Sequence, residues 1–62
     1  MDYELLRTKT LRYRAKHNLS QEAFANLVGV TKATIWNFES GKSKPTNLTQ
    51  QKILIAIEEK ED

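Results

Sequence analysis

One short pattern occurs three times in this sequence: Leu or Val, then Ser or Thr, then Phe or Ile four positions after the hydroxyl residue. The three occurrences are Leu19-Ser20 with Phe24, Val30-Thr31 with Ile35, and Leu48-Thr49 with Ile53. A Ser or Thr at a helix start accepts a hydrogen bond from a free N–H group of the first turn. The flanking apolar pair packs together as a hydrophobic staple. Three such starts within 62 residues predict a chain built from short helices.

The sequence predicts four helices and no strand. No stretch alternates strictly between apolar and polar residues, as a half-buried strand would. Asn18, Gly29 and Gly41 each follow a predicted helix, and we expect all three to take the left-handed conformation that commonly ends one. The last helix is expected to start after Thr49, with Thr46 as the alternative. The expected ranges are residues 2–17, 21–28, 32–40 and 50–60.

Composition excludes several classes of protein. Without cysteine the chain forms no disulfide and offers no thiolate to a metal, and His17 alone cannot make a histidine metal site. The longest apolar run, Ile53–Ile57, is too short to span a bilayer, and the first residues do not resemble a secretory signal. The sequence has no nucleophile–base set and no glycine-rich phosphate loop, so we expect no enzyme, cofactor or small-molecule substrate. We expect one domain over residues 1–62, with a frayed acidic tail at about 59–62.

The net charge is only +2, but it is unevenly distributed. Residues 1–44 carry eight Lys or Arg against four Asp or Glu, whereas residues 45–62 carry two against four. A basic body suits a polyanionic partner. A small positive charge also keeps an ordinary chain soluble, so charge alone does not decide between these interpretations.

Two of the predicted helices are joined by the three-residue turn Gly29-Val30-Thr31, which is the spacing of a helix-turn-helix. In the second of these helices, Ile35 and Phe38 point to one side. Such a short helix must dock this side on the rest of the chain, because it is not stable alone in water. The opposite stripe is then presented to solvent. Its residues are Lys32, Ala33, Trp36 and Asn37.

This outward stripe carries side chains that suit the edges of DNA bases. Asn37 can pair with adenine through two hydrogen bonds, and Lys32 suits guanine or a phosphate. Ala33 and the methyl group of Thr34 can contact a thymine methyl. A helix also fits the major groove of duplex DNA. The competing interpretation is a polar helix face that is merely solvated, which the helix-turn-helix spacing disfavours.

Several segments fall together at the spacing of one known family. They are Leu19–Ala25, Gly29–Lys32, Thr34-Ile35, Glu39–Lys42 and Pro45. With these segments the sequence resembles the Cro/cI-type helix-turn-helix family of phage and bacterial repressors, over about residues 5–57. The resemblance implies a compact all-α bundle of four to five helices with a helix-turn-helix, the fold of a lambda-repressor-like DNA-binding domain.

The resemblance also implies roles for individual residues. Gln21 would bind a DNA phosphate and brace the third helix. Arg14 would form a structural ion pair with Glu39 and so pin the first helix to the third. The base-reading positions would be Lys32, Ala33, Thr34 and Asn37. Trp36, which lies between them in the sequence, is a further candidate for base reading. The DNA backbone beside that helix would be contacted by Ser40, Lys42, Ser43 and Lys44, which position the protein without reading sequence.

Trp36 and Leu27 depart from the family pattern, since small or polar residues are usual at the first position and a polar residue at the second. An exposed Trp calls for a physical reason. The Trp36 ring would pack on a sugar–phosphate or a thymine methyl, contact a second subunit, or fold back over Lys32 or Ser40. The sequence leaves these alternatives open.

The last predicted helix adds a candidate dimer surface, because apolar residues 53–57 wrap more than one face and leave Leu54 and Ile55 in surplus. We therefore expect a sequence-specific transcriptional regulator, a Cro-like repressor that binds a pseudo-palindromic operator in double-stranded DNA as a weak homodimer. The dimer would form in solution or on the DNA, in the cytoplasm of a bacterium or phage-infected cell and not at a membrane. The alternative is a protein-interaction module on the same fold, such as an antitoxin or anti-repressor, which Trp36 and Leu27 would favour.

Overall fold

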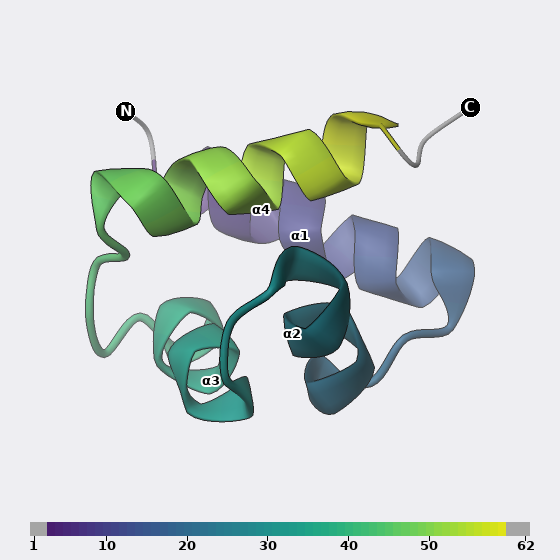
Figure 1. Cartoon of the computed structure of the whole chain (residues 1–62), viewed down its shortest axis with the longest axis horizontal. Coiled ribbons are helices and arrows are strands. Elements are labelled where there is room, and N and C mark those ends of the chain that lie inside the picture. The colour runs from purple at the N-terminus through teal and green to yellow at the C-terminus, as the bar shows by residue number, and fades with distance from the viewer. Residues whose placement is uncertain (1–2, 60–62) are drawn as a thin grey trace.

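The computed structural model describes residues 3–59, which form four helices and no strand (Figure 1). The helices are α1 (Tyr3–His17), α2 (Gln21–Val28), α3 (Lys32–Ser40) and α4 (Asn47–Glu59). This confirms the predicted all-α class, with the lower of the two expected helix numbers within the described residues. The predicted ranges of the second and third helices are confirmed. The predicted helix start at Asp2, the predicted end at Lys60 and residues 60–62 of the predicted tail lie outside the described part of the chain.

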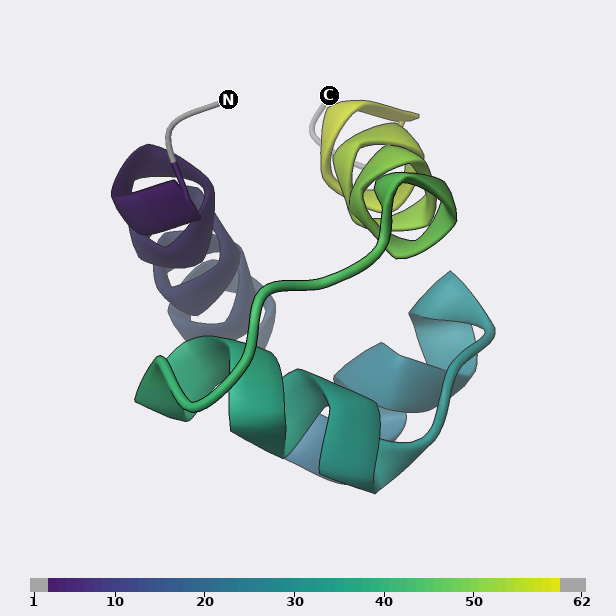
Figure 2. The same cartoon turned by 90° about the vertical axis from the view of Figure 1, so that its left-hand side faces the viewer.

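The four helices pack in two pairs. Figure 2 shows α1 and α4 side by side, with α2 and α3 lying beneath both. α2 packs against α3 and α4, and α1 packs against α3 and α4. α3 thus contacts both α1 and α2. Over the described residues, no helix is long and apolar enough to cross a membrane.

Three helices end in the same way, with one residue in the left-handed conformation. The positive φ angles are 55° at Asn18, 92° at Gly29 and 78° at Gly41, as predicted. After α1, the Leu19 N–H donates to the Arg14 carbonyl oxygen at 2.8 Å, a bond that reaches back to the last helical turn. The Val30 N–H and the Lys42 N–H make the equivalent bonds after α2 and α3. These closures turn the chain sharply and keep the four helices close together.

The helix starts confirm two predicted caps and correct the third. The Ser20 and Thr31 hydroxyls accept hydrogen bonds from the N–H groups three residues later, at 3.0 Å and 3.3 Å. At α4 the cap is Thr46, whose hydroxyl accepts from the Thr49 N–H at 3.2 Å. The predicted start at Gln50 is therefore wrong by three residues, because α4 begins at Asn47. Thr46, the alternative, is the capping residue.

The predicted hydrophobic staple at Leu48 is also wrong, because this side chain is 66% exposed. The physical reason lies in the preceding loop. Pro45 disfavours helix only at the residue before it, so the helix can begin directly afterwards at Thr46. The buried Gln50 side chain donates to the Pro45 carbonyl oxygen at 3.0 Å and to the Tyr3 hydroxyl at 3.2 Å. These bonds fix the loop that leads from α3 into α4.

The core collects apolar side chains from all four helices. The largest fully buried side chains are Phe24, Phe38, Ile35, Ile53 and the polar Thr10. Thr10 satisfies its hydroxyl by donating to the Leu6 carbonyl oxygen within α1, at 2.9 Å. Burial of one face of α3 in this core decides which face of that helix is left to solvent.

Candidate nucleic-acid interface

α3 has one buried and one open face. Ile35 and Phe38 are almost completely buried and anchor the helix on the core. On the opposite side Lys32, Ala33 and Trp36 are exposed and Asn37 is half-buried. We call the residues Lys32, Ala33, Trp36 and Asn37 the outward face of α3. α3 lies at the lower edge of the molecule in Figure 2, and Asn37 is the residue of this face that is partly covered.

Thr34 lies beside the outward face, and its hydroxyl is already engaged. Its oxygen lies 2.9 Å from the Thr31 hydroxyl oxygen, and its N–H donates to that same hydroxyl. Its side chain, half-buried, lines a shallow depression of about 200 Å³ between α3 and the start of α4. The depression is lined by Thr34, Asn37, Phe38, Ser43, Lys44, Pro45, Thr46 and Thr49. The outward face thus continues into a polar hollow with a lysine at its rim.

The loop after α3 presents its polar residues to solvent. Ser40, Lys42, Ser43 and Lys44 are all exposed. The Ser40 hydroxyl donates to the Asn37 carbonyl oxygen at 3.3 Å. The Lys44 ammonium lies 5.4 Å from the centre of the Tyr3 ring, and the Lys42 ammonium 4.8 Å from the centre of the Trp36 ring. Lys42 therefore stands next to the outward face, and Lys44 lines the depression that Asn37 also lines.

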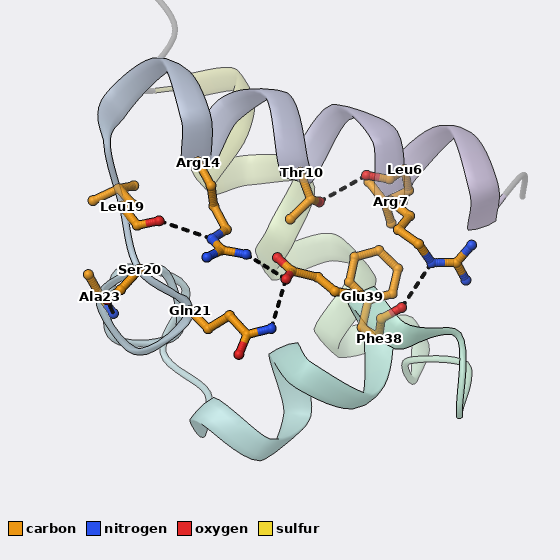
Figure 3. A network of polar contacts seen from close by, with 10 residues as sticks. All are labelled: Leu6, Arg7, Thr10, Arg14, Leu19, Ser20, Gln21, Ala23, Phe38 and Glu39. Carbon is orange, nitrogen blue, oxygen red and sulfur yellow. Dashed lines mark hydrogen bonds and ion pairs between the residues drawn. The ribbon is translucent and has the colours of Figure 1, made fainter.

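The carboxylate of Glu39 joins three helices (Figure 3). Its Oε1 pairs with the Arg14 guanidinium of α1 at 2.5 Å and accepts from the Gln21 side-chain amide of α2 at 3.0 Å. Arg14 also donates to the Leu19 carbonyl oxygen at 3.1 Å. The Glu39 side chain is only 7% exposed, and its Oε2 is buried without a hydrogen-bond partner among the described residues. This network sets the angle between α1 and the two shorter helices.

Comparison with known proteins agrees with this arrangement. A profile of the helix-turn-helix family matches residues 11–62, most of the chain. The chain belongs to the Cro/cI-type helix-turn-helix family. α2, the turn at 29–31 and α3 form its helix-turn-helix.

Two curated relatives share 44% identity with the chain over 41 residues. Both are named as uncharacterized helix-turn-helix-type transcriptional regulators, one from Archaeoglobus fulgidus and one from Methanocaldococcus jannaschii. The matched segment covers 66% of this chain, and 58% and 62% of the respective relatives. The chain thus spans about three fifths of the length of these curated relatives. No solved structure matches it.

Arg7 of α1 also contacts the helix-turn-helix, which the sequence did not predict. Arg7 donates from Nε to the Phe38 carbonyl oxygen at 3.0 Å, and its guanidinium carbon lies 5.8 Å from the centre of the Phe38 ring (Figure 3). The only signal in the sequence is its spacing, since Arg7 precedes Arg14 by seven residues and so shares its side of α1. Both arginines hold the last turn of α3.

The structure separates the two residues of the candidate dimer surface. Ile55 is 51% exposed, whereas Leu54 is half-buried and packs against the core. Leu48 lies seven residues before Ile55 and is also exposed, so these two share one side of α4. The large apolar residues that α4 exposes are therefore Leu48 and Ile55.

Proposed function

We propose that this chain is a sequence-specific DNA-binding transcriptional regulator that inserts α3 into the major groove. The observation that carries this proposal is the outward face of α3, which carries the basic Lys32 and the polar Asn37 and lies opposite the buried Ile35 and Phe38. A helix presented in this way fits the groove in width. Asn37 would pair with adenine and Lys32 with guanine or a phosphate, while Ala33 and Thr34 would meet thymine methyl groups.

The phosphate contacts would come from residues around the outward face. Lys42 and Lys44 supply charge, and the Ser40 and Ser43 hydroxyls supply hydrogen bonds. For Gln21 the bond to Glu39 supports a bracing role between α2 and α3. For the additional phosphate contact, Gln21 would donate the second N–H of its side-chain amide. Because cations displace counterions from DNA, affinity should fall steeply as salt rises.

We further propose that the regulator is a Cro-like repressor and that it binds a pseudo-palindromic operator as a weak homodimer. Two-fold operators need two copies of α3 spaced by one DNA turn, about 34 Å. The exposed Ile55, with Leu54 beside it, would supply the dimer contact. Sedimentation of the wild-type chain and of Ile55→Glu, free and with DNA, tests this surface. An unchanged sedimentation profile for Ile55→Glu would remove α4 from the dimer interface.

Binding-site selection tests the function directly. The chain is incubated with a pool of random duplexes, bound DNA is amplified over several rounds, and the selected site is compared with a shuffled one by fluorescence anisotropy. We expect enrichment of a two-fold site and at least tenfold tighter binding to it than to shuffled DNA, a modest demand for specific recognition. A pool that stays random after repeated rounds would contradict the proposal.

A second candidate function is a protein-interaction module on the same fold. The observation that favours it is the exposure of Leu27 at 40% and Trp36 at 44% on the two helices of the motif. In that case Leu27→Lys would abolish capture of the protein partner and leave DNA affinity unaltered. Lys32 and Asn37 on the outward face, with the exposed Lys42 and Lys44 after it, favour DNA.

A further inference from the structure

Trp36 and Lys42 form a contact that connects the outward face of α3 with the loop that follows it. The Lys42 ammonium nitrogen lies 4.8 Å from the centre of the Trp36 ring, within the range of a cation–π interaction. Trp36 is 44% exposed and Lys42 is exposed, so the pair stands at the molecular surface. The Trp36 ring therefore lies beside Lys42, a neighbour that was not among the alternatives drawn from the sequence.

The backbone of Lys42 is held as firmly as its ammonium. The Lys42 N–H donates to the Asn37 carbonyl oxygen at 3.0 Å, and the Gly41 N–H donates to the Phe38 carbonyl oxygen at 3.2 Å. These two bonds fix the start of the Lys42 side chain relative to the last turn of α3. The Trp36 ring then holds its far end. A long lysine side chain normally keeps much rotamer freedom at a surface, and here that freedom is restricted at both ends.

A ring restrains an ammonium in a way that a carboxylate cannot. The face of the indole attracts the cation through its quadrupole but does not neutralise the charge. The ammonium keeps N–H donors for another acceptor. The acidic residue of α3, Glu39, is turned inward to Arg14 and does not compete for Lys42. An aromatic partner thus orders the lysine and leaves it able to bind an anion.

We propose that Trp36 is a positioning residue that holds the Lys42 ammonium in place for one phosphate of the DNA backbone beside α3. This inference rests on the proposed DNA-binding function and assigns Trp36 a role other than contact with a base. The Lys42 side chain is already ordered in the free protein, so it loses less conformational entropy when it binds DNA than an unrestrained lysine would.

The contact itself is tested without DNA, since Trp36 is the single tryptophan of the chain. Tryptophan fluorescence of the wild type, Lys42→Met and Lys44→Met is quenched with iodide and, separately, with neutral acrylamide. A positive charge about 5 Å from the ring concentrates iodide there, so Lys42→Met should lower the ratio of iodide to acrylamide quenching about twofold. Lys44→Met, whose ammonium lies over Tyr3, should leave the ratio unchanged. An unchanged ratio in Lys42→Met would overturn the proposal.

The role in DNA binding is tested by a double-mutant cycle on the selected site. Trp36→Leu should weaken binding about two- to tenfold when Lys42 is present, the range for one lost restraint on a side chain. In the Lys42→Met background the same change should lower the affinity less than twofold. Where Lys42 is present, Trp36→Phe should retain most of the affinity, because it keeps an aromatic ring. Circular dichroism melts of each variant verify the fold, which a change at an exposed position should preserve.

Two outcomes of the double-mutant cycle would also overturn the proposal. An equal loss from Trp36→Leu in both backgrounds would mean that the indole contacts DNA itself. No loss in either background would mean that ordering Lys42 is irrelevant to binding. A wild-type chain that selects no DNA at all would overturn the proposed function and the phosphate contact together, whereas the quenching ratio would still decide whether Trp36 holds Lys42.

Discussion

Arg7 and Phe38 connect the first helix to the last turn of the third: the Arg7 Nε donates to the Phe38 carbonyl oxygen at 3.0 Å. Arg14 binds the carboxylate of the next residue, Glu39, from the same side of α1. The last carbonyl groups of a helix lack partners within the helix and carry partial negative charge. Two arginines spaced by two helical turns thus fix the end of α3 to α1, and with it the direction of the outward face.

Replacing Arg7 tests the first of these links. We expect Arg7→Met to lower the free energy of unfolding by about 1–2 kcal/mol, because a charged donor to a partly buried carbonyl is lost. Urea unfolding monitored by circular dichroism measures this. Arg12→Met is the matched control, since Arg12 is exposed on α1 and should change stability by less than about 0.5 kcal/mol. Equal effects of the two changes would assign no structural role to Arg7.

Replacing Arg14 leaves a buried carboxylate without its cation. Arg14→Met should therefore cost about 3 kcal/mol of stability, more than Arg7→Met, because the Glu39 side chain is only 7% exposed. Removal of both charges in Arg14→Met with Glu39→Leu should cost less than the sum of the single changes. Thermal melts of the two single variants and the double variant measure this coupling. Strictly additive losses would show that the pair contributes nothing as a pair.

Gly41 and Gly29 allow a test of backbone conformation separate from packing. A side chain at Gly41 would meet only Arg7 at 3.7 Å or more, and one at Gly29 would meet nothing within 4 Å. Both residues nevertheless have φ angles in the left-handed region, at 78° and 92°. We expect Gly41→Ala and Gly29→Ala each to cost about 1–2 kcal/mol in urea unfolding. A much larger loss at Gly41 would point to a clash with Arg7.

Asn37 is the residue of the outward face with the most specific chemistry. We expect Asn37→Ala to weaken binding to the selected site by about 1–3 kcal/mol and to relax one base position. Asn26→Ala is the matched control, because Asn26 is exposed on α2 away from the outward face. Anisotropy titrations with the selected site and with shuffled DNA separate the effects. A similar loss on both DNAs would remove Asn37 from base recognition.

Lys44 should act through charge alone. Lys44→Ala is expected to weaken binding to selected and shuffled DNA alike and to reduce the slope of log K against log salt by about 1. Titrations at several salt concentrations measure this slope, and Lys16→Ala, exposed near the end of α1, serves as the control. A slope that stays at the wild-type value would exclude a phosphate contact by Lys44.

The local signals in the sequence predicted most of the fold. Ser20 and Thr31 each stand two residues after a residue that tolerates positive φ, Asn18 and Gly29 respectively, and Gly41 is a third such residue, so these boundaries follow from short-range chemistry. The start of α4 did not follow from it. Thr46 and Thr49 are both good caps at helical spacing, and the hydrogen bonds of Gln50 that accompany the earlier start join residues up to 47 positions apart.

The candidate interface was predictable to the same limit. The outward face followed from the position of Ile35 and Phe38, because burial of one helix side determines the other. The contacts of Arg7 and Lys42 were not predicted. Arg7 binds a backbone carbonyl, which no residue type marks in a sequence, and Lys42 rests on a ring six residues earlier across a helix end. Long cationic side chains can reach many partners, and only the fold selects one.

The carboxylate of Glu39 has a consequence for how such a domain can diverge. The polar contacts that hold α3 against α1 and α2 are made at Glu39 and at the Phe38 carbonyl oxygen. None of them uses a residue of the outward face. Exchange of the outward side chains would therefore alter target preference without disturbing the frame. The residues that support α3 and the residues that it presents to solvent are separate sets.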